Sequence, residues 1–178
     1  MIPTGEATLG PFFPPRYVDA GVNDLTSFEG RKARGQAIEI RGKVTQEDGS
    51  ALDNLVVEIW QPDAAGIFRH PADPRYAQAD PDFLGWGRAA TDATGAYVFR
   101  TILPGAPQGR APHINFIVMY SGLMRILKTT MFFEDGSDPV LNLVLNRKSL
   151  LIGKKAGQNQ YTFDIRLRGE NETPFFDD

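Results

Sequence analysis

Two histidines and one arginine are the side chains whose chemistry deserves first consideration. The chain contains only His70 and His113, and Arg110 lies three residues before the second. His113 stands where a loop rich in proline and glycine gives way to an extended run, a place from which an imidazole is often aimed at a cavity. Such a histidine is more commonly a hydrogen-bonded structural residue than a metal ligand. His70, in a polar loop, is expected to be solvated. Arg110 suits either bidentate binding of a carboxylate or an ordinary surface position.

Composition excludes several other kinds of chemistry. The chain has no cysteine, so disulfides, thiolate zinc sites and thiol nucleophiles are excluded. It contains no HExxH motif, phosphate loop or nucleophile elbow. A net charge of −3 with scattered basic residues argues against nucleic acid as a partner. No apolar stretch approaches the roughly 20 residues that span a bilayer, and the first residues lack the features of a signal peptide. We therefore expect a cytoplasmic protein without a membrane segment.

The elements that must position these residues are short strands. Apolar and polar side chains alternate with a period of two over about seven stretches. The expected strands cover approximately residues 37–44, 54–61, 86–91, 96–102, 113–121, 126–133 and 161–168. One short helix is expected over residues 137–152, with Pro139 near its first turn. Residues 67–87 form a long loop, of a length that is often functional. This pattern predicts an all-β protein, a β-sandwich with mixed or antiparallel strands.

Residues 1–35 are typical of an arm rather than a core element. Glycines and prolines prevent a continuous helix, while four aromatic residues make the segment too apolar for a solvated tail. The arm is expected to lie either against its own sandwich or against a partner, and the sequence favours neither. A length of 178 residues suits one domain. We expect that domain to comprise the arm, residues 1–35, and a sandwich core, residues 36–178.

Several longer blocks of sequence cover nearly the whole chain: EIWQPDAAG at 58–66, DPDFLGWGR at 80–88, TDATGAYVFRTI at 91–102, RAPHINF at 110–116, YTFDIRLRG at 161–169 and GENETPFFD at 169–177. In content and in order, these blocks resemble the intradiol ring-cleaving dioxygenases. The resemblance implies a non-haem Fe(III) enzyme that uses O₂ to open a catecholic ring between its two hydroxyl-bearing carbons, giving a carboxymuconate.

The family's catalytic chains hold iron with two tyrosinates and two histidines, and these positions are mostly changed here. The first tyrosine falls on Phe68, and the short loop after Gly105 offers no second one. The histidines fall on His113 and Asn115. Ferric ion is a hard cation that needs anionic oxygen donors. We therefore expect no iron in this chain and a structural hydrogen bond on His113. The resemblance implies that Fe(III) is held by a sister β chain, for which this chain is a non-catalytic α subunit.

The resemblance also implies a pocket wall that is shared with the partner chain. In the family's α chains the arm reaches toward the partner's site, and the matching residues here are Thr8, Gly10, Pro11 and Phe12. Related α chains carry an arginine near the carboxylate of a small aromatic acid substrate, where this chain has Ser121. Arg125, four residues on, is the candidate substitute.

Two other functions remain open from the sequence. One is a homomeric metalloenzyme that uses His70 and His113 with acidic loop residues such as Asp80 or Asp82. The other is a stand-alone sandwich that acts as a binding module without an enzyme partner. The metal content and visible spectrum of the isolated chain separate the first from the α subunit, and co-purification with a partner separates the second.

Overall fold

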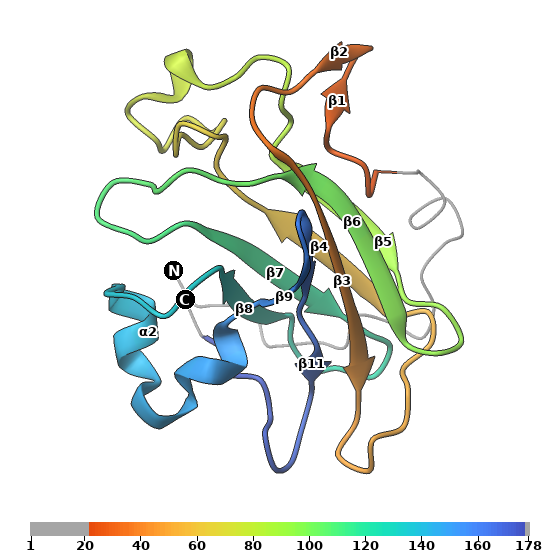
Figure 1. The fold of residues 1–178 in the computed structure, drawn as a ribbon. Coiled ribbons are helices and arrows are strands. Elements are labelled where there is room, and N and C mark those ends of the chain that lie inside the picture. Colours follow the sequence, from red (N-terminus) through yellow and green to blue (C-terminus); the bar gives the residue numbers. More distant parts are fainter. Residues whose placement is uncertain (1–21, 177–178) are drawn as a thin grey trace, which may run out of the picture.

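The computed structural model describes residues 22–176, which fold into two β-sheets packed face to face (Figure 1). This arrangement confirms the predicted β-sandwich. The first sheet has five strands: β3 (Ala37–Thr45), β6 (Ala96–Ile102), β9 (Lys154–Gly157), β10 (Gln160–Thr162) and β11 (Ile165–Arg166). Strand β3 pairs with β6 in antiparallel fashion on one side and with β10 and β11 in parallel fashion on the other. The sheet is therefore mixed, and β3 is its centre.

The second sheet positions most of the candidate site. Its strands are β4 (Val56–Trp60), β5 (Trp86–Ala90), β7 (His113–Met119) and β8 (Leu127–Phe132), in the order β5-β4-β7-β8. All neighbours in this sheet are antiparallel, and Trp60 lies opposite Asn115, which in turn lies opposite Thr130. Because alternate side chains of a strand point to opposite faces, these three share the face that points away from the core.

The core lies between the sheets and is rich in aromatic rings. Tyr97 and Phe99 of β6 point inward and are almost completely buried, as the alternation over residues 96–102 predicts. The ring of Phe116 in β7 lies 6.1 Å from that of Tyr97 and 5.0 Å from that of Phe163. Complete burial of each phenylalanine side chain contributes about 1.5–3 kcal/mol. These contacts fix the position of β7, at whose start His113 stands.

The prediction of one continuous helix over residues 137–152 is wrong. The structure has α2 (Pro139–Leu143) followed by a 3₁₀ helix, η2 (Leu145–Leu151), at one end of the sandwich beside β8 (Figure 1). The predicted place of Pro139 in the first turn is confirmed. Val144 leaves the helical geometry with φ −110° and ψ 9°, and its carbonyl then accepts from Arg147 N. Side-chain spacing predicted the apolar face but not this change in backbone hydrogen bonding.

The prediction of one continuous last strand over residues 161–168 is also wrong. It is divided into β10 and β11 by Phe163 and Asp164. Phe163 turns inward to the core, and its backbone N–H still donates to Arg41 O of β3. The Asp164 carboxylate accepts from Lys43 N, replacing a backbone carbonyl in the ladder. A side chain has thus taken over one ladder hydrogen bond, which an alternation pattern does not reveal.

The remaining described segments lie around the two sheets. The long loop between β4 and β5 is irregular, as predicted, apart from one 3₁₀ turn, η1 (Tyr76–Gln78). From the expected arm, residues 22–35 carry a small hairpin, β1 (Ser27–Phe28) and β2 (Arg31–Lys32), and Leu25 is buried in the sandwich core. The arm positions Thr8, Gly10, Pro11 and Phe12 lie outside the described residues. Between residues 22 and 176, no helix has the length and apolarity needed to cross a membrane.

Candidate functional site

The candidate site lies at the start of β7, where His113 joins a cluster of aromatic side chains from β4, the long loop and β8. The ring of His113 lies 6.2 Å from that of Phe68 and 5.7 Å from that of Phe132. Trp60 continues the cluster, with its ring 5.2 Å from Phe68 and 5.5 Å from His70. The structure thus brings together three of the residues singled out in the sequence, namely Phe68, His70 and His113. Trp60 and Phe132 complete what we call the ring cluster.

His113 is buried and held in one tautomer. Its side chain is 2% exposed, and its Nδ1 lies 2.7 Å from the carbonyl oxygen of Ala111. Because a carbonyl only accepts, Nδ1 carries the proton and donates. Burial lowers the pKa of His113, and the nearby Arg110 lowers it further, against opposing effects of the Ala111 carbonyl and Asp138. The imidazole is therefore neutral at pH 7 and bonded as a structural residue, as the sequence predicted.

The groups around His113 do not fit the ferric ion that the resemblance implies. Phe68 presents a hydrocarbon ring where an anionic oxygen is needed. The Asn115 side-chain oxygen accepts a hydrogen bond from Thr130 Oγ1 at 3.1 Å, and an amide oxygen carries no charge to balance a trivalent ion. Within residues 22–176, no three histidine, cysteine, aspartate or glutamate side chains form a group that could hold a metal ion.

Two acidic residues of the long loop, Asp73 and Asp80, bind backbone amides, whereas the carboxylate of Asp82 pairs with Arg31. Asp80, which is 4% exposed, accepts from Arg34 N at 2.7 Å and from Asp82 N at 3.1 Å. Burial tends to raise the pKa of Asp80, but these hydrogen bonds and the charge of Arg34 outweigh it and lower the pKa. Asp73 accepts from Phe68 N at 3.1 Å and so fixes the residue that contacts His113. Asp80 thus joins the long loop to the segment before β3, and Asp73 orders the loop internally, so the hydrogen bonds of both carboxylates are structural.

Arg110 is anchored by a buried carboxylate. Its Nε donates to Asp138 Oδ2 at 2.8 Å, and the same oxygen accepts from Ala111 N at 2.9 Å. Asp138 Oδ1 accepts from Val140 N at 2.8 Å, which caps the start of α2. Asp138 is completely buried. Burial alone would raise the pKa of Asp138, but its hydrogen bonds with Arg110, Ala111 and Val140 lower it overall. Arg110 is thus half-buried and paired, and not an ordinary surface arginine.

A cavity of about 300 Å³ adjoins the ring cluster and Arg110. Its wall is formed by aromatic, proline and charged side chains from β4, the long loop and the segment before β7. The main lining residues are Trp60, Phe68, His70, Pro74, Pro107 and Arg110. The position of His113 next to Phe68 means that this cavity lies where the resemblance would place the catalytic centre of an iron-binding chain.

Ser121 and Arg125 lie at the opposite end of β7. Strand β7 has seven residues, a length of roughly 20 Å, with His113 at its start and Ser121 just beyond its end. Both Ser121 and Arg125 line a second cavity of about 700 Å³, bordered by the β7–β8 turn, η2 and the segment after β11. Arg125, the candidate substitute for the arginine of related α chains, therefore lines the same cavity as Ser121. This cavity is remote from the ring cluster.

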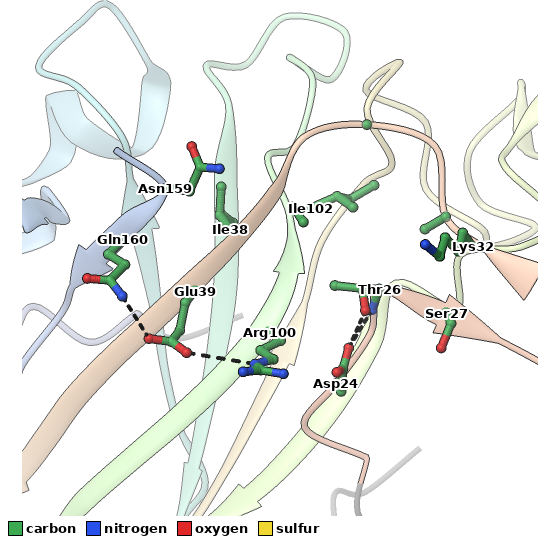
Figure 2. A pocket seen from close by; sticks show the side chains of 13 residues that line it. Asp24, Thr26, Ser27, Lys32, Ile38, Glu39, Arg100, Ile102, Asn159 and Gln160 are labelled. Carbon is green, nitrogen blue, oxygen red and sulfur yellow. Dashed lines mark hydrogen bonds and ion pairs between the residues drawn. The ribbon is translucent and has the colours of Figure 1, made fainter. Parts of the chain in front are cut away.

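A third hollow lies over β3 and β6 on the outer face of the first sheet (Figure 2). Two of its charged groups form a pair, with Glu39 Oε2 3.8 Å from Arg100 Nε, and Asp24 accepts a hydrogen bond from Thr26 N. Gln160 also donates to Glu39. No residue that the sequence analysis singled out lines this hollow of about 560 Å³, so we do not assign it to the candidate site.

Two residues of the site, Trp60 and Asp138, were not predicted from the sequence. The outward position of Trp60 follows from the inward positions of Val57 and Ile59, so alternation in β4 contained that signal. Asp138 before Pro139 is a recognisable helix N-cap. Its pairing with Arg110 joins residues 28 positions apart, and no local pattern predicts that.

Comparisons with known proteins agree with this geometry. A family model described as Dioxygenase matches residues 9–169. The chain is 34% identical to the protocatechuate 3,4-dioxygenase alpha chain of Burkholderia cepacia, over 98% of this chain and 96% of that one. It is 37% identical to the beta chain of the same organism, over 79% of this chain and 68% of that one.

Solved structures show the same fold. An intradiol ring-cleavage dioxygenase from Tetranychus urticae superposes with a TM-score of 0.63 at 19% identity, covering 93% of this chain and 96% of that one. The dioxygenase domain of a carbohydrate-binding fusion protein from Streptomyces gives a TM-score of 0.60 at 23% identity, covering 94% and 99%. From the family model and the alpha-chain identity together, the chain belongs to the intradiol dioxygenase family.

Proposed function

We propose that this chain is the non-catalytic α subunit of a hetero-oligomeric Fe(III) dioxygenase. The complete enzyme cleaves protocatechuate with O₂ to 3-carboxy-cis,cis-muconate, and a partner β chain holds the iron. The α subunit supplies assembly contacts and part of the pocket wall. We further propose that it acts in the cytoplasm and that residues 1–178 form one domain.

The observation that carries the proposal is the chemistry around His113. In place of anionic oxygens, the ring of Phe68 lies beside the imidazole, and the amide of Asn115 is bonded to Thr130. His113 itself is neutral, and its Nδ1–H donates a hydrogen bond to the backbone carbonyl oxygen of Ala111. A family member with this donor set needs another chain to supply the metal.

The extent of the similarity also supports an α subunit. The match to the Burkholderia cepacia alpha chain runs almost end to end on both proteins, whereas the match to the beta chain leaves about a third of that protein uncovered. The coverage of both proteins therefore favours an alpha chain, although the beta chain has a slightly higher identity over the part that is matched.

The separation of the two cavities supports a role for a partner chain. Arg125, the candidate contact for the substrate carboxylate, lies at the far end of β7 from His113. An arginine roughly 20 Å from the ring cluster cannot serve a substrate bound there. If Arg125 contacts a substrate, that substrate is held by another chain.

Co-expression with a candidate β chain tests the proposal. We expect the two chains to co-purify, the complex to contain iron, and protocatechuate to be turned over faster than catechol. The isolated chain should contain no stoichiometric iron and show no tyrosinate-to-iron absorption. Arg125→Gln in the complex should raise KM for protocatechuate more than for catechol, and Arg100→Gln, in the hollow over the first sheet, is the matched control. Stoichiometric iron in the isolated chain, or failure of every β chain to associate, would refute the assignment.

A further inference from the structure

Basic residues are concentrated in one part of the sequence, although the protein as a whole is acidic. Residues 139–168 contain six lysines and arginines but only one acidic residue, Asp164, whereas the net charge of the entire chain is −3. An asymmetry of this kind raises the local concentration of anions at the surface that carries it. The place where these positive charges meet in the fold is therefore a candidate for an anion site.

A hollow of about 330 Å³, which we call the basic hollow, lies where three strands of the first sheet present cationic side chains. Lys43 of β3 points away from the core because its neighbour Val44 points into it. Lys154 of β9 and Arg166 of β11 line the hollow together with Lys43, and Ser149 of η2 lies on another side. The basic hollow is thus built between the first sheet and η2.

The cations of the basic hollow have little anionic compensation. Within residues 22–176, no ion pair joins Lys43 or Lys154 to a carboxylate. The Arg166 guanidinium donates to two backbone carbonyl oxygens, which carry no net charge. Among the described residues that line the hollow, Asp164 is the only acid, and its Oδ1 already accepts from Lys43 N at 3.0 Å. A ligand therefore meets three positive charges and one negative charge from this part of the chain.

The spacing of the cations favours a ligand whose negative charge is divided among several groups. Strand β10 separates β3 from β9, so the backbones that carry Lys43 and Lys154 lie roughly 10 Å apart. Drawing both ammonium groups onto one compact anion would bring two like charges together, whereas carboxylates a few bonds apart meet each cation separately. The hydroxyl groups of Thr45 and Ser149 also line the hollow and are able to donate to carboxylate oxygens.

We propose that the basic hollow binds a small tricarboxylate whose carboxylates are joined by a short carbon chain. One carboxylate pairs with Lys154 at the edge of the sheet, a second pairs with Lys43, and the third lies beside Arg166. A volume of about 330 Å³ is at the lower end of the range for small-molecule sites, which suits a ligand of this size. The site belongs to this chain alone, requires neither iron nor a second subunit, and goes beyond the function proposed above.

Isothermal titration calorimetry on the isolated, full-length chain at low salt tests the proposal. The probes are tricarballylate, succinate, acetate and inorganic phosphate. We expect saturable binding of tricarballylate and about 5-fold weaker binding of succinate, which lacks one carboxylate. Acetate should not bind measurably, and the compact phosphate ion should bind at least about 5-fold more weakly than tricarballylate. Raising the NaCl concentration from about 20 mM to about 200 mM should weaken tricarballylate binding about 5-fold, because the charges are exposed and are screened by salt.

Four variants locate the ligand. Lys154→Gln should weaken tricarballylate binding about 3- to 5-fold. Lys155→Gln is the matched control, because it removes the same charge from the next residue of β9, which does not line the hollow, and it should change the affinity less than about 2-fold. Asp164→Asn retains an acceptor for Lys43 N but removes the negative charge, so it should strengthen binding about 2- to 5-fold. Ser149→Phe fills the hollow from an exposed position on η2 and should abolish binding.

Several results would overturn the proposal. These are no saturable binding of tricarballylate, equal effects of Lys154→Gln and Lys155→Gln, or unchanged affinity in Ser149→Phe. Phosphate binding as tight as that of tricarballylate would assign the hollow to a compact oxyanion instead. The expected gain in Asp164→Asn keeps the test decisive even where a variant with weaker binding is poorly folded. Because the measurement uses neither partner nor iron, a negative result leaves the α-subunit assignment standing, and failure of co-purification leaves this site standing.

Discussion

Replacing Asp138 by alanine tests whether this carboxylate organises the candidate site. Three donors converge on it within 3 Å: Arg110 Nε, Ala111 N and Val140 N. The substitution leaves all three without an acceptor in a place where water has no access, since Asp138 is completely buried. It also removes the cap of α2 and the counter-charge of Arg110.

The expected loss follows from these contacts. The cap alone is worth about 1 kcal/mol, and removing one partner of a buried ion pair costs about 3–5 kcal/mol. The side chain of Arg110 is 28% exposed, so part of its charge is solvated and the two contributions are not additive. We therefore expect the free energy of unfolding to fall by about 3–4 kcal/mol in total. Asp138→Asn, which retains the cap and one acceptor, should lose roughly half as much.

Equilibrium unfolding in urea, followed by circular dichroism, measures both losses. Asp92→Ala is the matched control, because Asp92 also accepts two backbone amides, from Thr94 and Ala96, but is exposed. If Asp138→Ala destabilises the chain no more than Asp92→Ala does, the reasoning about Asp138 is refuted. An unchanged slope of the urea transition is also required, so that the difference reports on the folded state.

Three further predictions concern the ring cluster and its loop. Asn115→His should restore neither iron nor turnover, because Phe68 still supplies no phenolate; metal analysis that finds bound iron would contradict this. The lowered pKa of His113 means that the unfolded chain binds its proton more readily, so stability should fall as the pH drops below about 6.5 toward the folded pKa. The free energy of unfolding, measured by urea titration at each pH, should change by at most about 1.4 kcal/mol per pH unit. This pH dependence should vanish in His113→Asn but persist in His70→Asn. Gly66 has φ +75°, and a Cβ there would lie 2.1 Å from Ala106 O. Gly66→Ala should therefore cost more than the roughly 1–2 kcal/mol of a left-handed alanine, whereas Gly49→Ala, with a positive φ but no close neighbour, should cost only that amount.

Local pattern predicted much of the sandwich but less of the site. The inward side chains Tyr97 and Phe99 follow directly from alternation, and they are buried as expected. The site depends on contacts between distant segments, such as Trp60 with Phe68 and Arg110 with Asp138. These pairings are decided by how the loop folds back on the sheet, and the loop is fixed by buried carboxylates whose amide partners leave no periodic signal.

The family resemblance selected residues that lie close together in the structure, but it gave less information about the local structure. It pointed to Phe68, His113 and Asn115, and the structure places Phe68 against His113, with Asn115 two residues along β7. It did not indicate that β10 and β11 are separated at Phe163 and Asp164, because the break depends on one carboxylate replacing a carbonyl in the ladder.

The central position of β3 has a consequence for how the chain is made. Its parallel neighbours, β10 and β11, are encoded about 120 residues later, so one edge of β3 stays open until residues 160–166 have been synthesised. Pairing over such a distance is intrinsically slow, and an unpaired edge invites association with other nascent chains. A polypeptide truncated before Gln160 should therefore aggregate during synthesis. The order of strands in this sheet thus determines how much the nascent chain depends on chaperones.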